Sequence, residues 1–276
     1  LATRYALQHA ARITSMDKTI ITRLNDEAAG AGVGLGSDEY YASRFASPQI
    51  RYPAWCVLAL KTTIEEIPLK VSDPGVARLK LAWWQDETSR TNHPLLKIGE
   101  QLGLDPNLLH TAVDNLSASL DSEFIGAQWK NDAAKQDWFS AAYTNVYQMI
   151  GADSALAIRL EESRSLLRLR DQLLVNICRF PEDKLTRYGI DLEGLLDSAQ
   201  QKVRQQLILE ELTSAAAKLN EALVERAERR GPLATYATLT LQRLKETITD
   251  GGQLLERKVD LTALRKIWIA WRCRWF

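Results

Sequence analysis

Residues Thr63–Pro94 read "TIEEIPLKVSDPGVARLKLAWWQDETSRTNHP", and this stretch predicts two helices joined by a tight turn. Ser72 and Asp73 are helix-capping residues, and the proline after them suits a first helical turn because it needs no backbone donor there. The second helix is therefore expected over residues 75–90. In the first helix Pro68 removes a backbone donor, so that helix is expected to end or kink at this position.

Similar start and stop signals recur along the rest of the chain. Asp105-Pro106 predicts a further helix start, and Gly251-Gly252 predicts a helix end, because glycine relieves a left-handed cap. An apolar stripe at helical spacing follows the first of these signals: Leu109, Val113, Leu116 and Leu120. No segment keeps the alternation of apolar and polar residues that is typical of a strand. The sequence therefore predicts an all-α fold, with one domain over residues 37–276.

Residues 1–36 are expected to stand apart from this domain. A helix is predicted over residues 1–27, and the run "AAGAGVGLG" at 28–36 then interrupts it. The glycine spacing is not GxGxxG and no apolar strand precedes it, which argues against a phosphate-binding loop. We therefore interpret residues 28–36 as a flexible Gly/Ala-rich linker.

The bulk composition narrows the classes of partner. The 276 residues carry 35 basic and 35 acidic side chains, so overall charge gives no support for a nucleic-acid partner. Cys56, Cys178 and Cys273 are far apart and lack metal-ligand spacing, which is typical of free thiols in a reducing cytoplasm. No apolar run reaches the roughly 20 residues that cross a bilayer. We expect a cytoplasmic protein that is soluble or peripheral to a membrane.

Five segments together indicate a family. They are "YYASRFASPQIRYPAWCVLALKTTIEE" (40–66), "VARLKLAWWQDETSRTNHPLL" (76–96), "VDNLSASLD" (113–121), "SLLRLRDQLLVNICRFPEDKLTRYGID" (165–191) and "LTALRKIWIAW" (261–271). In this order and spacing they resemble the squalene/phytoene synthase family, and the match spans Asp38 to Trp271.

The resemblance implies an isoprenoid-synthase-like helical bundle around a central cavity. Active members of that family condense prenyl diphosphates head to head, and two aspartate motifs on facing helices hold their Mg²⁺ ions. A diphosphate leaving group carries several negative charges, so divalent ions bridged to carboxylates stabilise its departure. Mg²⁺ is therefore the cofactor expected of an active member, and no cofactor is expected where the motifs are lost.

This chain departs from the family pattern at both motifs. The first motif falls on Pro68, Leu69 and Ser72, none of which is acidic. Glu65 and Glu66 precede it, but adjacent residues point about 100° apart on a helix and do not chelate as an i,i+4 pair. The second motif falls on non-acidic residues, or retains Asp171 alone if the register shifts by two. The sequence thus predicts that catalysis has been lost.

Several residues that match the family's diphosphate-binding positions remain. They are Ser43, Arg44, Arg51, Arg168 and Arg179. The functional interpretation is a metal-free anion site built from charge-assisted hydrogen bonds. The structural interpretation is that the arginines cap helices and pair with nearby carboxylates. Asp114, Asp121 and Asp171 remain candidate catalytic residues, of which the first two lie on one helix face.

Two tryptophan groups are also open to more than one interpretation. Trp83 and Trp84 are adjacent, so only one of them is expected to face the core, where it packs or lines a prenyl cavity. Trp268, Trp271 and Trp275 recur near helical spacing among basic residues. That pattern suits a helix at a membrane interface, a helix that docks a partner, or a helix that closes the domain core.

Three functions follow from these observations. The first is a non-catalytic protein that binds an isoprenoid or a partner protein; "ALKTTIEEI" (59–67) and "VDNLSASLD" resemble a branch that assembles respiratory complex I. The second is an active prenyl transferase that holds Mg²⁺ through the displaced carboxylates Glu65, Asp86, Asp114 and Asp121. The third is a peripheral membrane protein anchored by its C-terminal helix.

Overall fold

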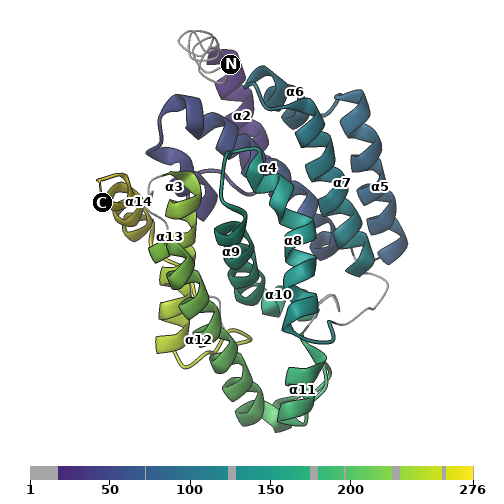
Figure 1. The fold of residues 1–276 in the computed structure, drawn as a ribbon, viewed down its shortest axis with the longest axis vertical. Helices are drawn as coiled ribbons and strands as arrows, with labels where there is room; N and C mark the ends of the chain where they lie inside the picture. Colours follow the sequence, from purple (N-terminus) through teal and green to yellow (C-terminus); the bar gives the residue numbers. More distant parts are fainter. Residues whose placement is uncertain are drawn as a thin grey trace.

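The computed structural model describes residues 18–71, 73–123, 129–174, 180–195, 197–225, 231–256 and 259–275. The regular secondary structure within these ranges is helical, as predicted (Figure 1). The elements in chain order are α2 (Lys18–Gly30), α3 (Asp38–Arg44), α4 (Pro48–Lys70), α5 (Pro74–Arg90), α6 (Pro94–Gln101), α7 (Pro106–Glu123), α8 (Asp132–Gln148), α9 (Ser154–Leu167), α10 (Leu169–Leu174), α11 (Glu182–Tyr188), a 3-10 turn η1 (Ser198–Gln200), α12 (Gln201–Glu225), α13 (Pro232–Thr249) and α14 (Ala263–Trp275).

The helices form one continuous bundle. Figure 1 shows α5 and α7 on one side, α12 and α13 on the other, and α8 and α9 between them. Helix α7 packs on α5 and α8, α8 packs on α9, and α9 packs on both α12 and α13. Helix α14 lies at the outer edge, where it contacts α3 and α13. Within the described ranges, every helix is too short or too polar to cross a membrane.

The predicted capping residues form the expected contacts at the ends of their helices. The carboxylate of Asp73 accepts a hydrogen bond from the Val76 amide at 3.0 Å, and Asp105 accepts one from the Asn107 amide at 2.9 Å. After α13, Gly251 adopts a left-handed backbone with φ of 75°. These capping predictions are confirmed, because each depends on a few neighbouring residues.

Pro68 was predicted to end or kink its helix, and the first of these alternatives is wrong. Helix α4 continues to Lys70 and contains Pro68 as a buried residue. The proline leaves one helical carbonyl without its usual partner. Ile64 and Ile67 are buried on the same helix, and their packing keeps the last turn in place.

The prediction of a flexible linker at residues 28–36 was also wrong. Helix α2 extends through Ala28 to Gly30, and the Val33 side chain is only 1% exposed in the core. The indole nitrogen of Trp55 donates to the Val33 carbonyl at 2.9 Å. Val33 therefore anchors this segment to the domain, because its apolar side chain and its backbone acceptor both find partners there, whereas Leu35 stays exposed.

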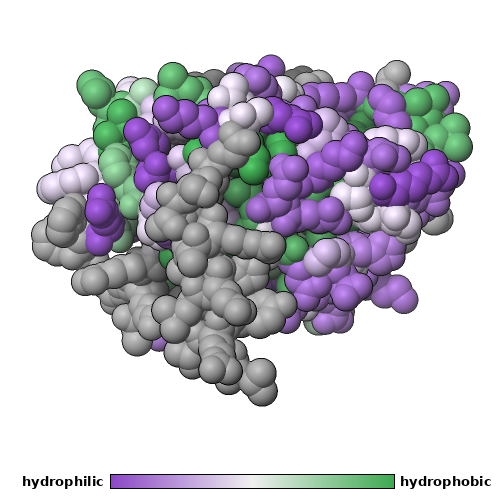
Figure 2. Space-filling model, turned by 90° about the horizontal axis from the view of Figure 1, so that it is seen from above, coloured by the Kyte–Doolittle hydropathy of each residue, from purple (hydrophilic) through white to green (hydrophobic). Residues whose placement is uncertain are grey.

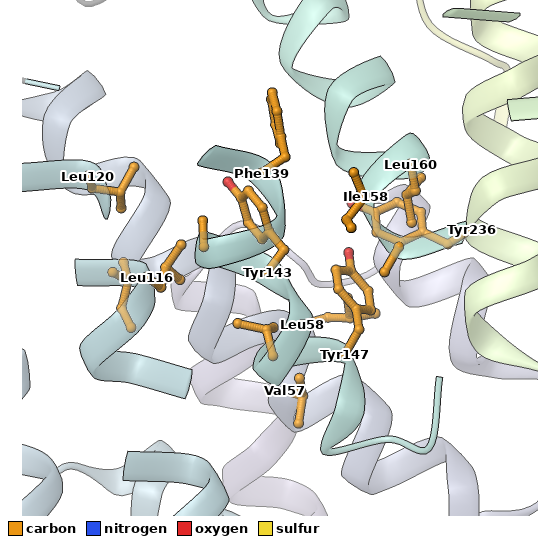
Figure 3. Close-up of a cluster of buried hydrophobic side chains, with 14 of the residues drawn as sticks. Val57, Leu58, Leu116, Leu120, Phe139, Tyr143, Tyr147, Ile158, Leu160 and Tyr236 are labelled. Carbon is orange, nitrogen blue, oxygen red and sulfur yellow. The ribbon is translucent and has the colours of Figure 1, made fainter. Parts of the chain in front are cut away.

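A cluster of buried tyrosines lies at the centre of the bundle. Figure 3 shows Tyr143 and Tyr147 projecting from α8 near Leu58, with Tyr236 of α13 opposite. The Tyr147 hydroxyl donates to Glu161 and the Tyr236 hydroxyl donates to Glu39. The apolar core therefore adjoins a set of buried carboxylates, and these form the candidate site.

Candidate functional site

Buried charged side chains from α3, α4 and α9 meet beside the tyrosine cluster. We call this group the core ion-pair network. Its members are Glu39, Lys61, Glu65, Glu161 and Arg164, and Glu66 and Arg168 extend it outward. Three carboxylates face two cations, and Glu66 and Arg168 add one of each sign, so most of the buried charge is paired and one negative charge is in excess.

Lys61 bridges the carboxylates of two helices. Its side chain is 0% exposed, and its ammonium lies 3.0 and 3.1 Å from the two carboxylate oxygens of Glu65 on α4. The same ammonium is 3.2 Å from Glu161 on α9 and 5.7 Å from the centre of the Tyr143 ring. A single buried cation thus links α4 to α9.

Arg164 is the second cation of the network. Its guanidinium lies 2.6 Å from Glu161, 3.1 Å from Glu39 and 3.6 Å from Glu65. It also lies 5.0 Å over the Tyr236 ring. Three helices are therefore tied together through one planar group, which suits a buried multi-partner position better than a lysine would.

These contacts set the ionisation of the acids. Burial alone raises the pKa of Glu65, but the ammonium of Lys61 and the guanidinium groups of Arg164 and Arg168 outweigh it and hold the pKa at about 2. Burial likewise raises the pKa of Glu39, and Arg164 nearby contributes to the net lowering. Both side chains are therefore carboxylates at neutral pH.

A cavity of about 570 Å³ opens beside the network. Its lining residues are Gly32, Val33, Gly36, Ser37, Asp38, Glu39, Thr62, Glu66, Leu69, Arg164, Leu167, Arg168, Asp171, Tyr236, Arg243, Asp260 and Lys266. Five of these are acidic and four are basic. The buried hydroxyl of Thr62 has no hydrogen-bond partner among the described residues.

The cations of the cavity wall already have carboxylate partners. Arg168 lies 2.5 Å from Glu66, and Arg243 lies 2.9 Å from Asp38. Lys266 lies 2.9 Å from the other oxygen of Asp38. The fourth cation belongs to the core ion-pair network. An anionic ligand would therefore compete with the carboxylates for every basic group in this wall.

The residues do not fit a magnesium cluster. Glu65 and Glu161 face each other across α4 and α9, but the ammonium of Lys61 lies between them. A divalent cation placed there would be repelled by that ammonium. Within the described ranges, no cluster of three or more acidic, histidine or cysteine side chains is arranged to hold a metal ion.

Only one of the predicted anion-binding residues that the structure describes lines this cavity. Arg168 does, whereas Ser43 is buried and donates to backbone carbonyls of its own helix. Arg51 donates to the Ala46 carbonyl at 2.9 Å, and Arg44 is exposed. For Arg51 and Arg168 the structural interpretation accounts for the contacts. Arg179, the fifth predicted residue, lies outside the described residues.

Asp114 and Asp121 do not face the cavity. Both lie on α7, where Asp114 pairs with His110 at 3.0 Å and Asp121 pairs with Arg78 of α5 at 3.2 Å. Each is partly exposed. The first contact lies within α7, and the second joins α7 to α5. Neither connects these carboxylates to the core ion-pair network.

The four carboxylates of the displaced-ligand alternative do not converge. Asp86 is exposed on α5 and pairs with Arg90 at 3.8 Å, whereas Glu65 is buried in the core ion-pair network. Asp114 and Asp121 lie on α7, as described above. The alternative predicted that these carboxylates converge on one metal site, and this prediction was wrong. Asp171 does line the cavity, although it is exposed.

The tryptophans divide into buried and exposed side chains. Trp84 is 4% exposed and packs in the core, whereas its neighbour Trp83 is 45% exposed. This confirms that one of the pair faces inward. Trp268 and Trp271 on α14 are 53% and 48% exposed, so neither closes the core. The side chain of Trp275 lies outside the described residues.

Sequence reasoning missed the centre of the site. Lys61 and Glu65 are an i,i+4 pair that follows the apolar run "WCVLAL" on the same helix, and this pairing is visible in the sequence. Glu161 and Arg164 form an i,i+3 charged pair in "LEESR". Charged pairs next to runs of apolar residues on two helices were the available signal for a buried ionic cluster.

Comparisons with known proteins place the fold. No protein-family model matches the sequence, and a search of curated proteins gives no match. The structure is similar to that of a dehydrosqualene synthase solved in complex with a ligand, with a TM-score of 0.73 and 10% identity over 93% of this chain and 96% of that chain. The chain therefore has the isoprenoid synthase fold, which confirms the predicted architecture.

Proposed function

We propose that this chain is a non-catalytic squalene/phytoene synthase-like protein that acts by binding. The observation that supports this proposal is the ammonium of Lys61 between Glu65 and Glu161. Loss of an allylic diphosphate needs divalent ions held by carboxylates. Here the carboxylates on the facing helices are neutralised by a lysine of the chain itself.

The lining of the cavity favours a partner protein or a polar ligand over a prenyl chain. Nine of the residues that line it are charged, and its aliphatic side chains are Val33, Leu69 and Leu167. A prenyl tail is wholly apolar, so entering this space would remove water from ion pairs without replacing it by polar contacts. That desolvation is costly.

The enzymatic part is tested with farnesyl diphosphate and Mg²⁺. We expect no pyrophosphate release above the protein-free blank and no saturable binding of farnesyl diphosphate by calorimetry. An active dehydrosqualene synthase serves as the positive control. The proposal is wrong if this chain releases pyrophosphate in a Mg²⁺-dependent way and Glu161→Gln, checked to be folded by circular dichroism, abolishes the release.

The most concrete form of the binding role is an assembly factor for respiratory complex I, which the resemblance at residues 59–67 and 113–121 implies. In that form, deleting the gene in a host that has complex I lowers the amount of assembled complex, and the wild-type gene restores it. Native gels with an in-gel activity stain measure this amount. If deletion of the gene leaves the amount of assembled complex I unchanged, the assembly role is rejected.

A further inference from the structure

Helix α14 has a buried inward face and an exposed apolar outward face. The inward face packs against α3 and α13 and includes Ile269, Ala270 and Lys266, which are all buried. The outward face carries four large apolar side chains at positions i, i+3, i+4 and i+7. They are Leu264, Ile267, Trp268 and Trp271, with exposed fractions of 81%, 39%, 53% and 48%. A helix already seated on its domain therefore presents an apolar stripe to its surroundings.

The inward face fixes the direction of this stripe. The Lys266 ammonium lies 2.9 Å from Asp38 and 3.0 Å from Asp260, and it donates to the Gly36 carbonyl at 3.0 Å. Burial lowers the pKa of Lys266, but the carboxylates of Asp38 and Asp260 outweigh it and raise the pKa overall. Because these contacts hold one side of α14, the helix cannot turn its tryptophans inward without losing them.

Basic residues flank the outward stripe. Helix α14 contains four basic residues and no acidic one. Arg272 is exposed, and its guanidinium lies 4.6 Å over the ring of Trp268. Arg265, on the same side of the helix, forms an ion pair with Glu246 and is still half exposed.

The apolar surface continues onto α12. A groove of about 320 Å³ between α12, α13 and α14 is lined in part by Leu223, Val224, Trp268 and Arg272. Val224 is exposed on α12. Green apolar side chains come to the surface at the left edge of Figure 2, the edge at which α14 lies in Figure 1. The patch is thus wider than one helix.

We infer that α14, together with the adjoining end of α12, binds the surface of a membrane that contains anionic lipid. Tryptophan is the residue most typical of the membrane–water interface, where its ring is apolar and its N–H stays hydrated. Arginines beside an apolar stripe are attracted to anionic headgroups and are typical of interfacial helices. Because α14 has basic residues and no acidic one, its charge is complementary to that of an anionic membrane surface. This inference uses a different part of the molecule from the proposed function and does not depend on it.

Vesicle co-sedimentation of the full chain tests the inference. We expect the protein to sediment with phosphatidylcholine vesicles containing about one third phosphatidylglycerol, and to bind pure phosphatidylcholine at least about fivefold more weakly. The double variant Trp268→Ser/Trp271→Ser is expected to lose about tenfold or more in vesicle affinity, and Arg272→Gln about fivefold for anionic vesicles only. These side chains are exposed, so thermal melts should show that the variants remain folded.

Trp83→Ser is the matched control, because Trp83 is similarly exposed but lies on α5, across the molecule from α14 (Figure 1). It should bind vesicles as the wild type does. No binding by the wild type would overturn the inference and leave the patch to a protein partner. Equal losses in the Trp83 and Trp268/Trp271 variants would overturn it as well, because binding would then be non-specific.

Discussion

Replacing Lys61 by methionine tests whether the core ion-pair network holds the bundle together. Methionine fills a similar volume but carries no charge. The substitution removes an ammonium that lies 3.0 Å from Glu65 and 3.2 Å from Glu161. Both carboxylates stay buried, and their remaining cationic partners are Arg164 and Arg168.

The expected loss of stability can be derived from these distances. Each contact is worth about 5 kcal/mol of Coulomb energy at an effective dielectric constant of about 20. The cost of burying the ammonium offsets much of that sum, and removing one member of a buried pair costs about 3–5 kcal/mol in measured cases. Because Arg164 still contacts both acids, we expect the lower end, about 3 kcal/mol. With a urea m-value of about 3 kcal/mol/M, the midpoint should fall by about 1 M.

Urea denaturation of three variants measures this loss of stability and its controls. Lys70→Met is the matched control, because Lys70 also pairs with a glutamate four residues away on α4 but is 64% exposed. We expect it to lose less than about 0.5 kcal/mol. The double variant Lys61→Met/Glu65→Gln should regain more than half of the single loss, since removing one acid with the lysine restores the original balance of buried charges. A loss below about 1 kcal/mol in Lys61→Met, or no recovery in the double variant, would refute the reasoning.

Two further predictions concern pH and thiol chemistry. The pKa of Glu65 in the folded state, about 2, lies below its ordinary value of 4.5, so its stabilising contribution is complete above about pH 4.5 and is lost as the pH falls toward 2. The free energy of unfolding should therefore depend less steeply on pH over that range in Glu65→Gln, and an unchanged slope would contradict this. Burial raises the pKa of the Cys56 thiol to about 12, so a thiol reagent at pH 8 should label Cys56 only in denaturant. Peptide mass spectrometry measures the labelling, with the half-buried Cys273 as the internal comparison; equal native rates for the two would count against it.

The sequence was informative wherever structure depends on near neighbours. Asp73 and Asp105 cap helices through amides two or three residues away, and the apolar stripe of α7 is buried as its spacing predicts. Pro68 and Val33 were misjudged for the opposite reason. Both are held by packing against residues elsewhere in the bundle, and that packing overrides the local preferences of proline and of a Gly-rich run.

The candidate site was harder to predict because its contacts join distant parts of the chain. Glu39 meets Tyr236 almost two hundred residues later, and Glu66 meets Arg168 about one hundred residues later. A single sequence gives no register between helices, so Arg168 could be recognised as a cavity residue only from the family resemblance. The role of Lys61 depends on the facing position of Glu161, which lies one hundred residues later in the chain.

The charges around the cavity oppose the binding of a diphosphate. A diphosphate site needs a surplus of positive charge, supplied either by metal ions or by unpaired basic side chains. This wall has five acidic and four basic side chains, so its formal charge is negative before any ligand enters. A diphosphate would have to take Arg168 from Glu66 at 2.5 Å and Arg243 from Asp38 at 2.9 Å, and it would leave those carboxylates unpaired. Since an unpaired carboxylate in such a place is itself strongly unfavourable, the geometry that stabilises the fold also opposes the binding of diphosphate.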